Sequence, residues 1–254
     1  MLTYYDFNKT NISRPILIVH GLFGSAQNWQ TFAKNIAQNG FRVITVDLRN
    51  HGNSFHHDAH NYEVMVSDLL SVIDKLGSPV DIIGHSMGGK AAMLLSCLYP
   101  SYVNKIAVVD IAPVKYKHSQ LDKVLALLRV DLSKIIKRSD IDWLLLKDIP
   151  DPRERSFLML NLVLRDGGYK WKINLNALRK NMPDIMDFPD HNFSFTKPTL
   201  FISGSESSYI KEEYLSSIKD AFPNYRLETV NNCGHWIHSD NPIALLLALS
   251  DFFS

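Results

Sequence analysis

The amino-acid sequence predicts an α/β fold built on a mostly parallel, doubly wound sheet. The prediction rests on short runs of apolar, β-branched residues, on helical patterns between most of them, and on their alternation. Strands that are buried on both faces read as nearly continuous apolar runs, and strands that alternate with helices are typical of α/β proteins. The chain has 254 residues, of which 46% are hydrophobic, so it is long enough to bury a large core.

Six runs are expected to form the strands, and residues 2–8 are a candidate for an antiparallel edge strand. Residues 16–19 read Ile-Leu-Ile-Val and residues 80–83 read Val-Asp-Ile-Ile, as expected of buried strands. The expected strands are residues 15–20, 42–47, 80–84, 105–110, 199–203 and 226–230. The expected helices around the sheet are residues 26–39, 62–76, 87–98, 211–221 and 242–253.

The alternation stops after Pro113 and resumes near Lys197. We therefore expect residues 1–113 and 191–254 to form a core domain and residues 114–190 to form an inserted helical cap. Ligands of open α/β sheets bind outside the carboxyl ends of the strands, where we expect the cap to lie. An appended bundle without a role at the site is the alternative. The expected cap contains helices over residues 121–129, 132–137, 141–146, 154–164 and 175–180, no strand, and irregular sequence over 182–192.

The net charge and the cysteine content argue against a nucleic-acid-binding protein and against a disulfide-rich secreted protein. The chain carries 27 basic and 26 acidic residues, a net charge of +1, which gives no reason to expect nucleic acid or an anionic membrane as partner. Residues 114–190 hold 15 basic and 11 acidic residues, a local charge of 15 − 11 = +4. Two cysteines imply no disulfide framework. Neither a signal peptide nor a membrane span is expected, so a cytoplasmic location is predicted.

The pentapeptide Gly84-His85-Ser86-Met87-Gly88 is the strongest motif of the chain. It follows an expected strand and precedes an expected helix, the context in which G-x-S-x-G forms a nucleophile elbow. The small residues on both sides of the serine allow strand and helix to approach closely. We therefore expect Ser86 to be an exposed nucleophile at the end of a strand.

A serine nucleophile needs a base that accepts its proton and a carboxylate that orients the base. His235 is the expected base because it follows the last expected strand, and His238 is the weaker competitor, expected to be structural or exposed. The usual acid position, in the loop after residues 199–203, holds Ser207, which carries no charge. Asp110 is therefore the favoured acid and Glu206 the alternative, with Ser207 expected to support the pair by hydrogen bonding.

An oxyanion hole is expected from two backbone N–H groups. One belongs to Met87, the residue after the nucleophile, and the other to the early loop His20-Gly21-Leu22-Phe23-Gly24. We expect Leu22 to donate, with Phe23 as the second choice. His20 is expected to brace the loop through side-chain hydrogen bonds.

The remaining histidines, cysteines and aromatic residues are not expected to take part in catalysis or to bind a metal. The histidine-rich segment of residues 51–60 lacks the ligand spacing of a helical metal site, so we expect a solvated loop and no metal. Cys97 is expected in the core, and Cys233 is not expected to be a nucleophile. The histidine-rich segment contains His51, His56, His57, Asp58 and His60. The aromatic residues that are candidates to line the site are Phe23, Trp29, Phe157, Trp171 and Trp236.

Five motifs of the chain are residues 19–25, 47–54, 84–90, 109–113 and 234–236. Together they resemble the α/β-hydrolase superfamily, and within it the bacterial YbfF-type esterases, which are related to the ABHD11-like branch. The similarity spans nearly the whole chain, although residues 114–190 contribute few motifs. The resemblance implies an α/β-hydrolase fold and a triad of Ser86, His235 and Asp110, with Ser207 in support. Asn50 is a small departure from the glycine that is frequent in Arg-Gly-His-Gly.

The function expected from these residues is that of a serine esterase that works without a metal or organic cofactor. The resemblance implies short-chain acyl esters as substrates, and acyl-CoA thioesters among them. A carbon–carbon bond hydrolase or lyase on the same core is an alternative, as is a non-catalytic ligand receptor on a hydrolase scaffold. The sequence does not indicate the oligomeric state.

Overall fold

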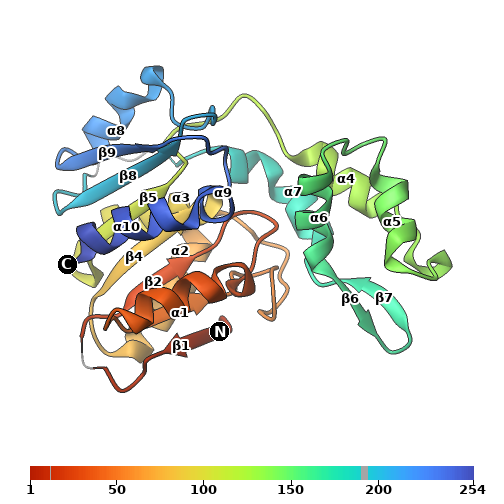
Figure 1. Cartoon of the computed structure of the whole chain (residues 1–254), viewed down its shortest axis with the longest axis horizontal. Coiled ribbons are helices and arrows are strands. Elements are labelled where there is room, and N and C mark those ends of the chain that lie inside the picture. The colour runs from red at the N-terminus through yellow and green to blue at the C-terminus, as the bar shows by residue number, and fades with distance from the viewer. Residues whose placement is uncertain (12, 190–193) are drawn as a thin grey trace.

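The computed structural model describes residues 1–11, 13–189 and 194–254, which form a seven-stranded sheet with helices on both faces and a projecting helical segment (Figure 1). The spatial order of the strands is β1-β3-β2-β4-β5-β8-β9, and only β1 runs antiparallel, beside β3. The predicted mostly parallel sheet and its antiparallel edge strand are therefore confirmed. In chain order the strands are β1 (Tyr4–Phe7), β2 (Ile16–Val19), β3 (Val43–Val46), β4 (Val80–His85), β5 (Val103–Val109), β8 (Thr199–Gly204) and β9 (Tyr225–Val230).

The strand order reverses between β2 and β4. From β2 the chain adds β3 on one side and then β4, β5, β8 and β9 on the other. Open α/β sheets bind ligands outside the carboxyl ends of the strands at such a switch point. The loops that follow β2 and β4 begin at His20 and Ser86, so the topology brings these two loops side by side.

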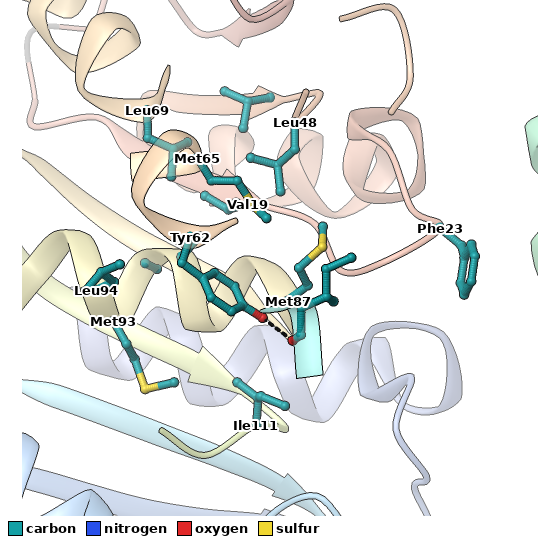
Figure 2. Close-up of a cluster of buried hydrophobic side chains, with 14 of the residues drawn as sticks. Val19, Phe23, Leu48, Tyr62, Met65, Leu69, Met87, Met93, Leu94 and Ile111 are labelled. Carbon is teal, nitrogen blue, oxygen red and sulfur yellow. Dashed lines mark hydrogen bonds between the residues drawn. The ribbon is translucent and has the colours of Figure 1, made fainter. Parts of the chain in front are cut away.

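Helices cover each face of the sheet because residues alternate along the strands. Ile16 and Ile18 of β2 face the cluster formed with α1 and α10, whereas Leu17 and Val19 face the cluster formed with α2 and α3. Figure 2 shows side chains of α2 and α3 gathered with Val19 in this second cluster. The helices are η1 (Ala26–Trp29), α1 (Gln30–Gln38), α2 (Tyr62–Leu76), α3 (Met87–Leu98), η2 (Pro100–Tyr102), η5 (Glu212–Tyr214), α8 (Leu215–Ala221), α9 (Ile237–Asp240) and α10 (Pro242–Phe253).

The segment between β5 and β8 projects to one side of the sheet (Figure 1). It contains α4 (Leu121–Arg129), η3 (Leu132–Lys134), α5 (Arg138–Leu145), α6 (Pro152–Leu158), η4 (Met159–Asn161), β6 (Leu162–Arg165), β7 (Gly168–Trp171) and α7 (Leu175–Met186). The predicted helix over residues 132–137 is reduced to the single turn η3. The helix expected over residues 141–146 begins earlier, at Arg138.

The prediction that this segment contains no strand is wrong. The helix expected over residues 154–164 ends at Leu158, and β6 pairs with β7 as an antiparallel hairpin. Asp166 and Gly167 form its turn with φ angles of 51° and 77°, the left-handed conformation that Asp-Gly hairpin turns require. The irregular stretch expected over residues 182–192 is also partly helical, since α7 runs to Met186 with Pro183 inside it. Residues 190–192 of that stretch lie outside the described residues.

Candidate active site

Ser86 lies at a sharp turn between β4 and α3. Its φ of 52° and ψ of −122° are strained for a residue with a side chain, and such strain is concentrated at functional sites. The turn depends on its glycines. A Cβ atom on Gly84 would lie 2.7 Å from the Gly88 carbonyl oxygen, and one on Gly88 would collide with the carbonyl oxygens of Val19 and His20.

His235 bridges Ser86 and Asp110. Its Nε2 lies 2.9 Å from the Ser86 Oγ, and its Nδ1 lies 2.7 Å from Asp110 Oδ2. Asp110 follows β5 and is completely buried, and His235 is in the loop after β9. Three residues that are far apart in the sequence therefore form one continuous hydrogen-bonded series at the carboxyl ends of β4, β5 and β9.

The Asp110 carboxylate has two further hydrogen-bond donors. The backbone N–H of Gly204 donates to Oδ1 at 3.1 Å, and the Ser207 hydroxyl donates to Oδ2. Glu206 is exposed, and among the described residues its carboxylate makes no hydrogen bond to His235. The structure therefore places Asp110 rather than Glu206 against the imidazole, with Ser207 beside it.

In the loop after β2, the backbone N–H groups of Phe23 and Leu22 differ in whether they have a hydrogen-bond acceptor. The Phe23 N–H donates to His51 Nε2 at 3.3 Å, whereas no hydrogen bond joins the N–H of Leu22 or Met87 to an acceptor within the described residues. The Phe23 N–H is therefore engaged, whereas Leu22 and Met87, which line the same cavity as Ser86, have N–H groups that can donate to a ligand oxygen. His20 braces this loop as expected, with Nδ1 donating to Gly21 and Nε2 accepting from Leu48.

The expectation of a solvated loop over residues 51–60 is wrong for two of its histidines. His51 and His60 are completely buried, while His56, His57 and Asp58 are exposed. Burial holds the pKa of His51 well below its usual value and lowers the pKa of His60 to about 3, so both rings are neutral near pH 7. No group of three or more potential ligands that could hold a metal is found among the described residues.

Two residues that sequence reasoning did not single out hold His235 in place. The ring of Tyr209 stacks on the imidazole with centroids 3.8 Å apart, and His85 Nε2 donates to the His235 carbonyl at 2.9 Å. His238 is partly buried and stacks on Trp29 at 4.5 Å, which agrees with a structural role. Tyr209 and His85 each lie close to a residue that the sequence did single out, since Tyr209 is two residues after Ser207 and His85 directly precedes Ser86.

Ser86 and His235 line a cavity of about 200 Å³ between the sheet and the projecting segment. Three of the five predicted aromatic residues, Phe23, Phe157 and Trp236, line it. Trp29 and Trp171 do not, since Trp29 is buried in the core beneath the site and Trp171 belongs to the β6–β7 hairpin.

Cys97 and Cys233 are buried, as expected of inert thiols, and burial raises the pKa of Cys97 to about 11.

A serine on a strained turn after a central strand of an open, mostly parallel α/β sheet defines the class of α/β hydrolases. A family model described as alpha/beta hydrolase fold matches residues 14–242. The chain therefore belongs to the α/β-hydrolase family. In the part of the chain that the structure describes, no helix combines the length and apolar character that a membrane crossing requires.

Named relatives support this assignment over almost the whole chain. The sn-1-specific diacylglycerol lipase ABHD11 of Mus musculus is 38% identical over 94% of this chain and 80% of that protein. The esterase YbfF of Escherichia coli strain K12 is 34% identical over 97% of this chain and 95% of that protein. The solved structure of a marine microorganism esterase is similar with a TM-score of 0.93 and 36% identity, covering 99% of this chain and 98% of the other. The protein is therefore a hydrolase of the esterase and lipase group.

Proposed function

We propose that this hydrolase cleaves short-chain acyl esters through a covalent acyl-enzyme on Ser86. The observation that carries the proposal is the position of His235, whose two ring nitrogens lie within hydrogen-bond distance of the Ser86 hydroxyl and the Asp110 carboxylate. In this arrangement His235 Nε2 accepts the proton of Ser86 as the oxygen attacks the substrate carbonyl. Asp110 holds the tautomer with a proton on Nδ1 and stabilises the imidazolium that forms.

The backbone N–H groups of Leu22 and Met87 stabilise the negative charge that develops on the carbonyl oxygen. Loss of one such donor costs about 3 kcal/mol of transition-state stabilisation. The tetrahedral intermediate collapses when the leaving alcohol takes a proton from His235, which leaves the acyl group on Ser86. Water then attacks the acyl-enzyme, with His235 as base, and the acid is released.

The cavity indicates the size of the acyl group. Its volume of about 200 Å³ is below the roughly 300–1,000 Å³ of pockets that enclose drug-sized ligands, which favours a short acyl chain. The cavity wall includes residues from the sheet region and from α4, α6 and α7, so we propose that residues 114–190 act as a cap that shapes the pocket.

Acyl-CoA thioesters stay a prediction from the sequence resemblance. Two lysines line the cavity, and both already have partners: Lys123 pairs with Glu154 at 2.6 Å, and the Lys90 ammonium donates to backbone carbonyls. Neither is free to bind the phosphates of a CoA group. The cytoplasmic location likewise stays a prediction.

A substrate panel tests the proposed function. The panel contains p-nitrophenyl esters from acetyl to dodecanoyl, the matching acyl-CoAs and diketones, with Ser86→Ala as the control variant. We expect kcat/KM to be highest for the short esters and to fall by orders of magnitude in Ser86→Ala. Equal activity of Ser86→Ala would contradict the proposed nucleophile, and activity confined to carbon–carbon substrates such as diketones would contradict the substrate class.

A further inference from the structure

Lys90 is a cation buried in the wall of the candidate active site. It lies in the first turn of α3, four residues after Ser86, and only 1% of its surface is exposed. Its side chain lines the same cavity as Ser86. Because a buried charge is strongly unfavourable unless its hydrogen bonds are satisfied, the partners of this ammonium group indicate its role.

The three N–H donors of the ammonium are matched by three backbone carbonyl oxygens. Nζ donates to Val114 at 2.8 Å, to Met186 at 3.1 Å and to Asp187 at 2.7 Å. It also lies 4.7 Å from the centre of the Tyr116 ring, within range of a cation–π interaction. Burial lowers the pKa of Lys90 to about 7, but only the protonated form has three donors for these acceptors. No donor is left over for a ligand.

The three carbonyls belong to the two connections between the sheet region and the projecting segment. Val114 lies between β5 and α4, where the chain enters the segment, and Met186 and Asp187 lie at the end of α7, where it leaves. The two connections also contact each other, since the Tyr116 N–H donates to the Met186 carbonyl at 2.9 Å. Through these hydrogen bonds, Lys90 joins both connections to α3, the helix that follows Ser86.

A hydrogen bond from another helix, α2, also holds the connection at the end of α7. The hydroxyl of Tyr62, in α2, donates to the Ile185 carbonyl at 2.6 Å, and Figure 2 draws this bond from the Tyr62 ring. Tyr62, Tyr116, Ile185 and Met186 all line the cavity. The position of one cavity wall therefore depends on how the two connections are held.

We propose that Lys90 is a positioning residue that limits the length of the acyl pocket by holding both connections against α3. This inference rests on the proposed esterase function. Without the ammonium, the carbonyls of Val114 and Asp187 lose this donor, and that of Met186 keeps only the Tyr116 N–H. The connections are then no longer held against α3 and move outward so that the carbonyls left without a donor reach water. The wall that contains Tyr116 and Met186 then recedes, and longer acyl chains fit.

Lys105 provides a matched control. Its Nζ donates to the carbonyls of Phe252 and Ser254 at 2.8 and 3.2 Å and lies 5.6 Å from the Phe252 ring centre, so it is also a lysine that fastens chain segments through carbonyls. It does not line the cavity. Lys105→Met therefore removes a similar set of bonds without changing the pocket wall.

The test compares kcat and KM for p-nitrophenyl butyrate and octanoate in the wild-type protein, Lys90→Met and Lys105→Met. We expect the octanoate-to-butyrate ratio of kcat/KM to rise about tenfold in Lys90→Met, mainly through a lower KM for octanoate, because a few added methylene contacts have effects of this size. Lys105→Met keeps the wild-type ratio. A wild-type ratio in Lys90→Met, or an equal change in Lys105→Met, would overturn the inference.

Two further outcomes are distinguishable. If Lys90→Met does not fold, Tyr62→Phe removes a single bond to the same connection and should raise the ratio to a smaller extent, whereas an unchanged ratio in that variant contradicts the inference. If the wild-type protein hydrolyses neither ester, the proposed function fails and the inference fails with it. An unchanged ratio in active variants rejects only the role of Lys90.

Discussion

The ring of Tyr209 lies almost parallel to the imidazole of His235, with an interplanar angle of 17° and ring centroids 3.8 Å apart. The backbone N–H of Tyr209 donates to the Ser207 hydroxyl, which in turn donates to Asp110. The phenol oxygen of Tyr209 receives a hydrogen bond from Gln120 at 3.1 Å, on the projecting segment. Tyr209 therefore links the imidazole, the carboxylate and the cavity wall.

The stacked ring is expected to matter more than the hydroxyl. Tyr209→Leu should lower kcat by about tenfold, since an aromatic pair contributes about 0.5–1.5 kcal/mol beyond its buried area. Tyr209→Phe retains the ring and should stay within about threefold of the wild-type kcat. Steady-state kinetics with p-nitrophenyl butyrate measure both variants, and an equal loss in the two would assign the effect to the hydroxyl instead.

The choice between the two carboxylates leads to a second prediction. Asp110→Asn should lower kcat by about 10⁴-fold, because the amide holds the wrong imidazole tautomer. Glu206→Gln, at an exposed position, should leave kcat within about twofold, as expected of a surface change. Circular dichroism spectra serve as the control for folding. A large loss of kcat in Glu206→Gln with little change in Asp110→Asn would reverse the assignment.

Gly88, one of the glycines of the turn around Ser86, leads to a third prediction. A Cβ on Gly88 meets the backbone carbonyls of Val19 and His20, whereas a Cβ on Gly168 meets nothing within 4 Å. Gly88→Ala should therefore destabilise the protein by about 3 kcal/mol or more, as overpacking of rigid backbone does. Gly168→Ala should leave the free energy of unfolding nearly unchanged. Urea unfolding of the two variants decides the point, and similar midpoints would contradict it.

The partly buried His238 should make the stability of the protein depend on pH. Burial lowers its pKa from 6.5 to about 4, so the unfolded chain takes up a proton first as the pH falls. The free energy of unfolding should therefore decrease between pH 6.5 and about 4, by up to about 3 kcal/mol from this residue. His238→Phe preserves the stacking on Trp29 and should reduce this decrease. Urea unfolding at pH 7 and pH 4 tests the prediction, and the same decrease in both proteins would refute it.

The strands and the residues near Ser86 were readable from the sequence because both depend on local patterns. Apolar runs identify strands that are buried on both faces, and the order of strand, glycine-rich turn and helix locates Ser86 before any contact is known. Asp110 was selected because the catalytic base needs a carboxylate beside it, and Ser207, at the usual acid position, carries no charge. Glu206 stayed open as an alternative because the direction of a loop side chain is not a property of the local sequence.

The errors arose where tertiary contacts override the local pattern. His51 and His60 lie in a polar segment, yet both are buried. The Nε2 of His51 accepts from the distant Phe23 N–H, and the Nδ1 of His60 lies 3.2 Å from the Asn50 side-chain amide nitrogen. The hairpin after α6 was missed although Asp166-Gly167 is a recognised turn signal, because Leu158–Leu164 also fits a helical pattern. The partners of Lys90 come from positions 24 and about 97 residues away, beyond any local signal.

Covalent labelling with a fluorophosphonate probe, followed by peptide mapping, tests the central claim most directly. The arrangement of Ser86, His235 and Asp110 predicts a single adduct on Ser86, which is absent in Ser86→Ala and forms far more slowly in His235→Ala. Loss of esterase activity should follow the extent of labelling. An unlabelled wild-type protein, or an adduct on another residue while Ser86→Ala still hydrolyses esters, would contradict the account.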